Sequence, residues 1–449
     1  MPQLAVRDPA TEELVGEVAL SSTDECLAAC DRAAAALGPW QRLAPRARAE
    51  ILRAAFELLL EEREALAALI TSENGKTLDE SRGEVGYAAE FFRWFAEEAV
   101  RVGGEVRTAP GGDKRIVVLP QPVGVALLVT PWNFPAAMAT RKIAPALAAG
   151  CTVVLKPAPE TPLTAFAVAD VLRRAGVPEG VVNVVLPEPP VEAVRAMLAH
   201  PAVQKLSFTG STEVGAILLA EAAPHIVRCS MELGGNAPFL VFADADVDVA
   251  VEAALLAKLR NTGASCIAAN RFYVHESLAE SFTARFAAAM GDAVIGALVN
   301  KPERDKVASL VAGALDQGGR VRVGGHPPER RGAFYPPTVL DRVPASADIF
   351  RREIFGPVAP VTTFVDEDEA VRLANDSPVG LMSYVMTRDL ARGLRVAEAI
   401  ETGMVSINRG LISDPAAPFG GMKGSGLGRE GGFEGIDEYL ELKYVGVAW

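Results

Sequence analysis

The stretch VGVALLVTPWNFPAAMATRKIAPALAAGCTVVLKP, residues 123–157, determines the fold class of this chain. It begins with an apolar run, continues through an alanine-rich segment of helical character, and ends in a second apolar run, CTVVLKP. Apolar strands that alternate with helices indicate a parallel sheet covered by helices on both faces. The segment therefore predicts an α/β fold.

The same alternation continues along the chain. A helical TPLTAFAVADVLRRAG and the strands VVNVVLP and VQKLSFTG follow, and a helix is expected from Ser211 to about Ala223. After Gly234–Gly235 a second series begins, whose predicted elements are the strand FLVF, a helix over 247–259, the strand RFYVH and a helix over 278–290. We therefore expect two parallel α/β domains with a boundary near residue 235.

The N-terminal part has a different pattern. Residues 4–20 alternate in polarity around Asp8-Pro9, which predicts a hairpin. Helical spacing of apolar residues predicts helices over 21–37, 44–70 and 78–100. The following segment RIVVLPQP contains prolines, which favour edge strands, and the tail EYLELKYVGVAW reads as one strand that needs a partner.

Composition limits the class of protein. The 449 residues carry a net charge of −13 and no dense basic run, which argues against a nucleic-acid surface. Five widely spaced cysteines are typical of a reduced, cytoplasmic protein, and no secretory signal or membrane span is visible. Cys26 and Cys30 lie four residues apart, but with no histidine near them we expect core positions, and no metal site.

A cysteine between small residues is the first candidate for chemistry. Cys266 lies in RNTGASCIAANR, residues 260–271, and Glu232 lies 34 residues upstream in MELGGNAPFLVF. A cysteine nucleophile and a carboxylate base are the groups needed to form and then hydrolyse a thioester. The alternative is that Cys266 is a buried apolar residue, as most free cysteines are.

Further motifs suggest a nucleotide and an oxyanion. In FTGSTEVG, residues 208–215, a strand turns at a glycine into a helix whose N-terminus suits a pyrophosphate, although a simple capped helix has the same pattern. Lys156 follows a strand and could reach ribose hydroxyls, or be a surface lysine. Asn133, held between aromatics and prolines in TPWNFP, has the rigid amide that an oxyanion hole requires.

These motifs, together with EIFGP and PFGGMKGSGLGRE, occur in the order and approximate spacing of the NAD(P)-dependent aldehyde dehydrogenase superfamily. The resemblance covers nearly the whole chain. Within the superfamily, the segments MATRKIAPALAAGCTVVLKPA, NRGLISD and GIDEYLELKYV are similar to the succinate-semialdehyde dehydrogenase branch.

The resemblance implies roles for particular residues. Cys266 would be the nucleophile, Asn133 and the Cys266 amide would form the oxyanion hole, and Glu232 would activate the deacylating water. The implied cofactor contacts are Trp132, Lys156, Gly210, Ser211, Gly215, Glu353 and Phe355. The implied partners of a substrate carboxylate are Arg141, Arg260 and Ser413.

The resemblance also implies a domain plan. Residues 1–103 and 123–234, with part of 425–438, would form a cofactor-binding domain, and residues 235–424 a catalytic domain. Residues 104–122 and 439–449 would form an oligomerisation element of a homodimer or homotetramer.

The chain departs from the family pattern at several positions. Ala264 replaces a usual glutamine, Ala268 a second cysteine and Arg352 a glutamate, and the stretch around 290–299 is shortened. Pro159 stands where relatives that favour NAD often carry a glutamate, so NADP is slightly favoured over NAD.

The implied reaction is oxidation of succinate semialdehyde to succinate. Three alternatives remain open at this point. The substrate could be another ω-carboxy or an aromatic aldehyde. The enzyme could transfer its acyl group to coenzyme A, in which case it would not need Glu232 for hydrolysis. The chain could also be a catalytically silent scaffold on the same fold.

Overall fold

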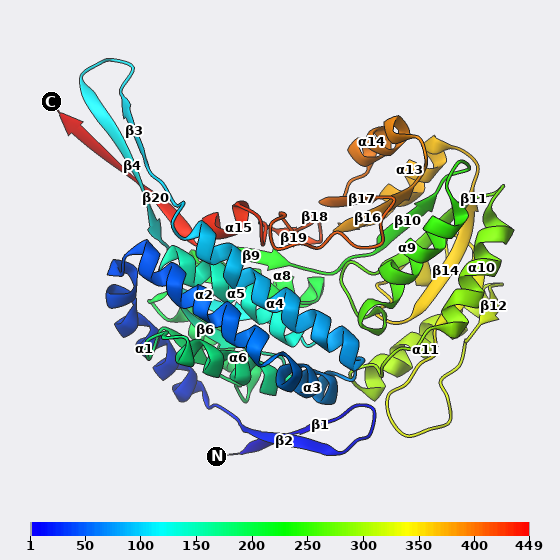
Figure 1. Cartoon of the computed structure of the whole chain (residues 1–449), viewed down its shortest axis with the longest axis horizontal. Helices are drawn as coiled ribbons and strands as arrows, with labels where there is room; N and C mark the ends of the chain where they lie inside the picture. The colour runs from blue at the N-terminus through cyan, green and yellow to red at the C-terminus, as the bar shows by residue number, and fades with distance from the viewer. Residues whose placement is uncertain (1, 449) are drawn as a thin grey trace.

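The structure is a computed structural model that describes residues 2–448. Figure 1 shows two α/β bodies side by side, with a long β-ribbon projecting from the first of them. The N-terminal hairpin, β1 (Gln3–Arg7) and β2 (Leu14–Ala19), lies along the opposite side of the first body (Figure 1). Two parallel sheets and a ribbon confirm the predicted fold class.

The first body is built on a six-stranded sheet. Its order is β19 (Gly426–Leu427), β9 (Arg228–Glu232), β8 (Val203–Thr209), β5 (Val125–Val129), β6 (Thr152–Lys156) and β7 (Val182–Val184). All its pairings are parallel except that of β19 with β9. The five residues of β5 are all buried, as expected for a strand covered on both faces.

Helices cover both faces of this sheet. One face packs against α2 (Pro45–Glu61), α4 (Leu78–Glu98), α5 (Pro135–Ala149) and α6 (Pro162–Arg174). The other packs against α1 (Thr23–Arg42), α7 (Pro190–Ala199) and α8 (Thr212–Ala222). Cys26 and Cys30 are buried on α1, which confirms their predicted core positions.

The single helix predicted over 44–70 is wrong. The chain instead forms α2 and then α3 (Arg63–Asn74), and the break lies at Glu62, whose φ and ψ are −94° and 13°. The bend lets α3 pack against α4. It also brings Asn74, the last residue of α3, to the loop that precedes α5. Because the residues around Glu62 all favour helices, local propensity contains no signal for this break.

The second body is built on a seven-stranded sheet. Its order is β12 (Arg320–Val323), β13 (Thr338–Asp341), β14 (Val358–Phe364), β11 (Ala269–His275), β10 (Ala237–Val241), β16 (Met382–Met386) and β17 (Met404–Ile407). Only β12 runs antiparallel to its neighbour. Its helices are α9 (Val247–Leu259), α10 (Ala279–Asp292), α11 (Lys301–Asp316), α12 (Asp348–Arg351), α13 (Glu367–Asn375) and α14 (Leu390–Ala399).

The projecting ribbon is a three-stranded antiparallel sheet. Its central strand β4 (Lys114–Pro122) pairs with β3 (Glu105–Thr108) on one side and with β20 (Leu440–Ala448) on the other. The C-terminal strand therefore has the partner it was predicted to need. β4 and β5 are separate strands of different sheets, because Gly124, with φ of 133°, turns the chain between them.

The chain crosses from the carboxyl end of a strand in the first body to the amino end of a strand in the second. β9 of the first sheet ends at Glu232, and β10 of the second begins at Ala237. Ligands of open α/β sheets bind outside the carboxyl ends of the strands. The crossing therefore places Glu232 at the position where such a fold binds its ligands. Over residues 2–448, the structure contains no helix with the length and apolarity that a membrane span requires.

Candidate active site

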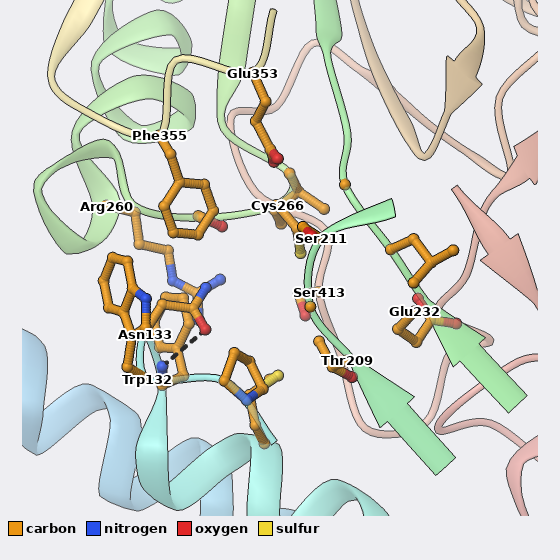
Figure 2. Close-up of a pocket in the computed structure, with 18 of the residues that line it drawn as sticks. Trp132, Asn133, Thr209, Ser211, Glu232, Arg260, Cys266, Glu353, Phe355 and Ser413 are labelled. Atoms are coloured by element: carbon orange, nitrogen blue, oxygen red, sulfur yellow. Dashed lines mark hydrogen bonds between the residues drawn. The ribbon is translucent and has the colours of Figure 1, made fainter. Parts of the chain in front are cut away.

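A cavity between the two bodies brings together nearly all of the predicted site residues. Its lining includes Asn133, Trp132, Arg141, Gly210, Ser211, Glu232, Arg260, Cys266, Glu353, Phe355 and Ser413. Figure 2 labels nine of these residues, all except Arg141 and Gly210, and shows them on separate segments of the chain. Of the predicted residues, Lys156 and Gly215 do not line it.

The cysteine loop has an unusual backbone. Asn261 and Thr262 have φ of 54° and 55°, and Gly263 follows at 78°. A Cβ atom at Gly263 would lie 2.3 Å from the carbonyl oxygen of Gly356, so glycine is required there. Non-glycine residues with positive φ cost free energy and persist only where the surroundings hold them. Here Glu80 of α4 accepts the Asn261 amide at 2.5 Å and contributes to holding the loop.

Cys266 is half-buried in this loop and faces the cavity. Burial raises the pKa of its thiol to about 12, and the nearby positive charge of Arg141 opposes that shift. Gly235 is needed beside it, because a Cβ there would lie 2.3 Å from the Cys266 carbonyl oxygen. Since the thiolate is the nucleophile, the resting thiol must lose its proton when the chemistry begins.

Glu232 is a buried carboxyl group at the end of β9. Its Oε2 accepts no hydrogen bond within residues 2–448. Burial and the neighbouring Glu430 raise its pKa well above the ordinary value, while Arg141 and Lys142 oppose the shift. A carboxyl group with a raised pKa has the basicity that proton abstraction near neutral pH requires.

Asn133 presents an amide nitrogen to the cavity. Its Oδ1 accepts the Phe134 amide at 3.1 Å, and its Nδ2 donates to the Ala264 carbonyl at 3.2 Å. Because Nδ2 carries two hydrogens, one remains available to a developing oxyanion. Ala264 and Ala268, two of the departures from the family pattern, are both buried.

Arg141 on α5 is buried and has polar neighbours that are half-buried. Its Nη2 donates to the Tyr87 hydroxyl at 2.6 Å and to the Ser413 hydroxyl at 3.5 Å, and those two hydroxyls lie 2.5 Å apart. The Arg260 guanidinium lies over the rings of Phe134 and Tyr87, at 4.8 and 5.6 Å. Two arginines and two hydroxyls can together hold a carboxylate.

Tyr87 was missed by the sequence reasoning. It comes from the middle of α4, 54 residues before Arg141 and 326 before Ser413 in the chain. A tyrosine in an amphipathic helix normally indicates only packing, so the sequence contains no local signal for this position.

The side of the cavity that was predicted to contact the cofactor has a carboxyl group and two aromatic rings. Glu353 accepts a hydrogen bond from the Gly235 amide at 3.2 Å. Burial raises the pKa of Glu353 to about 7, and this hydrogen bond opposes the shift. Trp132 and Phe355 pack edge to face with ring centroids 5.3 Å apart. Lys306 of α11 lies over Phe355 at 5.8 Å and also lines the cavity, although no motif indicated it.

The remaining predicted cofactor contacts lie at strand and helix ends. Ser211 caps α8 by accepting the Val214 amide at 3.3 Å. Lys156 ends β6, and burial lowers its pKa while Glu160 opposes the shift. Gly215 lies within α8, where a Cβ would meet the Leu233 side chain at 2.4 Å, so its observed contribution is close packing.

Comparison with known proteins gives one consistent result. The model of the aldehyde dehydrogenase family matches residues 2–445. A succinate-semialdehyde dehydrogenase of Paenarthrobacter nicotinovorans is 53% identical over 97% of this chain and 99% of its own length. The NADP+ succinate-semialdehyde dehydrogenase GabD of Escherichia coli K12 is 48% identical over 98% and 93%. The crystal structure of succinate-semialdehyde dehydrogenase from Burkholderia pseudomallei superposes with a TM-score of 0.98 at 47% identity, covering 100% and 95% of the two chains.

Proposed function

Because the chain belongs to the aldehyde dehydrogenase family, we propose that it oxidises a carboxylate-bearing aldehyde, and that this aldehyde is succinate semialdehyde. The membership confirms the family predicted from the motifs. The observation that carries the substrate proposal is the cluster of Arg141, Tyr87 and Ser413 in the same cavity as Cys266. A buried guanidinium with two hydroxyls recognises an anionic end group by charge-assisted hydrogen bonds.

The proposed chemistry uses three residues of the cavity. The Cys266 thiol gives its proton to solvent, and the thiolate sulfur attacks the aldehyde carbon, so that the C=O π electrons move to the oxygen and form an oxyanion next to the Asn133 side-chain amide. The nicotinamide cofactor, when bound, accepts the hydride of this carbon. The thioester left on Cys266 is then attacked by water, whose proton passes to Glu232 as the carbon–sulfur bond breaks and the acid is released.

The residues present fit a nicotinamide dinucleotide. The capped N-terminus of α8 follows directly on the carboxyl end of β8, where backbone amides suit a pyrophosphate. Gly234 lets the Glu353 carboxyl group lie close to the backbone here, because a Cβ at residue 234 would lie 2.9 Å from Glu353 Oε2. Ser211, Glu353 and Phe355 would hold the cofactor, and Lys156 would lie near its adenosine ribose.

The arginines provide the test of the substrate. Arg141→Ala or Arg260→Ala should raise KM for succinate semialdehyde about 100-fold or more, because unpairing one member of a buried charged contact costs roughly 3–5 kcal/mol. The KM for butanal, which has no carboxylate, should change little. Steady-state absorbance of the reduced cofactor measures both constants.

A matched control is Arg48→Ala. Arg48 is also buried but lies outside the cavity, where it donates to the carbonyls of Ala148 and Leu43. It should lower stability and affect both aldehydes equally. Equal effects of Arg141→Ala on the two aldehydes would contradict the substrate proposal.

The same assay separates the remaining alternatives when it is run with other ω-carboxy aldehydes and with aromatic aldehydes, each with and without coenzyme A. The absence of any oxidation would indicate a catalytically silent scaffold.

Cofactor choice is the second part of the proposal. We propose that the enzyme uses NADP at least as well as NAD, because Pro159 offers neither an acceptor for ribose hydroxyls nor a charge that repels a 2′-phosphate. Lys156 lies nearby as a cation. The kcat/KM with each cofactor checks this, and a preference for NAD above about 10-fold, or 1.4 kcal/mol, would contradict it. In the matched variant, Pro159→Glu, the preference should shift towards NAD.

We also propose that each segment of the predicted domain plan has its own role. Residues 1–103 and 123–234, with part of 425–438, would bind the cofactor, and residues 235–424 would supply the catalytic cysteine. The ribbon of 104–122 and 439–449 would join copies of the chain, since its residues Val106 and Leu442 are both 73% exposed. Light scattering of the purified protein distinguishes a monomer from a homodimer or homotetramer.

Five free cysteines support a cytoplasmic location, which cell fractionation would test.

A further inference from the structure

Two buried charged residues beneath the Asn133 loop take no part in the chemistry described above. Lys76, in the turn between α3 and α4, is 1% exposed, and Glu84 of α4 is 2% exposed. Lys76 Nζ lies 2.5 Å from Glu84 Oε2. Removing both charges from water is expensive, and apolar residues of similar size would usually be as stable in such a place. The attraction between the two charges therefore does not by itself explain why they are buried here.

Both residues also bind the backbone on either side of Phe134. Lys76 Nζ donates to the carbonyl oxygen of Asn133 at 2.7 Å and lies 4.3 Å from the centre of the Phe134 ring. Glu84 Oε1 accepts the amides of Ala136 at 2.9 Å and Ala137 at 3.3 Å. These two amides are in the first turn of α5, and that helix has no side-chain cap of its own. Glu84 therefore caps α5 from another helix, where its negative charge is also favourable.

The same Asn133 carbonyl links this pair to the cysteine loop. Asn261 Nδ2 donates to it at 2.7 Å and to the Ala264 carbonyl at 2.9 Å. The side-chain nitrogen of Asn133, Nδ2, also donates to the Ala264 carbonyl. The backbone of Asn133 is thus held from one side by Lys76 and from the other by the segment that carries Cys266.

We propose that Lys76 and Glu84 are positioning residues that aim the Asn133 amide at the aldehyde oxygen. This proposal rests on the oxyanion role given to Asn133 in the proposed function. Lys76 fixes the peptide group of Asn133, and Glu84 fixes the helix start that follows it. An oxyanion donor acts only when it is held at the position where the charge develops, so loosening its support lowers the rate of the step that forms the charge.

A double-mutant cycle tests the proposal. The variants are Lys76→Met, Asn133→Ala and their combination, and the measurement is the first-turnover rate of cofactor reduction with the best aldehyde substrate. Lys76→Met alone should lower this rate by about 10–100-fold, since loss of an entire oxyanion donor costs roughly 10²–10³-fold. The KM for aldehyde and for cofactor should change by less than about 3-fold. In the Asn133→Ala background, Lys76→Met should cause no further loss, because both changes remove the same interaction.

Effects that multiply in the double variant would overturn the proposal. If Asn133→Ala alone leaves the rate unchanged, the oxyanion role in the proposed function is wrong, and this outcome is distinct from the first. The pair Lys76→Met with Glu84→Gln removes both charges and keeps an acceptor for the α5 amides. It carries the same test if the single variant does not fold.

A buried lysine elsewhere provides the matched control. Lys205 is 0% exposed and pairs with Glu438 at 3.0 Å, at the base of the ribbon. Lys205→Met should lower the melting temperature, and any effect on the rate should multiply with that of Asn133→Ala. Coupling of Lys205 to Asn133 as strong as that of Lys76 would show that the cycle reports general loosening, and would overturn the positioning role.

Discussion

Replacing Cys266 by alanine is expected to abolish aldehyde oxidation and to leave cofactor binding intact. Among the described residues, Cys266 is the only cysteine that lines the cavity. Without its sulfur no thiohemiacetal forms, and removing the nucleophile of a covalent enzyme typically lowers kcat by on the order of 10⁴-fold or more. Steady-state cofactor reduction measures the loss, and calorimetric titration with NADP measures binding.

Cys229→Ala is the control for this substitution. Cys229 is half-buried on β9 and lies outside the cavity, so its loss should leave activity within a factor of about two. Iodoacetamide should inactivate the parent protein and the Cys229→Ala variant alike, and aldehyde should protect both. Normal turnover by the Cys266→Ala protein would refute the covalent mechanism.

The second large effect is expected from Glu232→Gln. Glutamine has the shape of glutamate but cannot accept the proton of the attacking water, so the thioester on Cys266 should accumulate. The variant should produce a burst of about one reduced cofactor per active site and then stall, with steady-state turnover lowered roughly 10²–10⁴-fold. Mass spectrometry of the quenched protein should show the added acyl group.

The pH profile gives an independent measure of the same residue. Glu232 acts as a base only when ionised, and burial, together with Glu430, raises its pKa. Deacylation by the parent enzyme should therefore increase with pH through a range that lies above the ordinary titration of a glutamate, and this dependence should disappear in Glu232→Gln. Exposed Glu192 provides the control, because Glu192→Gln should keep both the rate and the profile. Linear turnover without a burst in Glu232→Gln would assign deacylation to another group.

The fold was predictable wherever its causes are local. The apolar runs of β5 and β6 and the helical spacing of α5 are properties of neighbouring residues, and the structure confirms them. The break at Glu62 was missed because the bend depends on the packing of α3 against α4, which local helix propensity does not encode. The ribbon could be suspected from its prolines, but its pairing with the C-terminal strand brings together residues more than 300 positions apart.

The sequence by itself determined the α/β class, the family and the identities of Cys266, Glu232, Asn133 and the two arginines as candidates, because motifs with small residues and fixed spacing carry that information. Only the tertiary structure decided that these residues share a cavity. It also added Tyr87, Lys76 and Glu84, whose partners lie on other elements. A buried hydrogen bond or ion pair depends on how helices pack, and packing brings together residues whose separation along the chain leaves no local pattern.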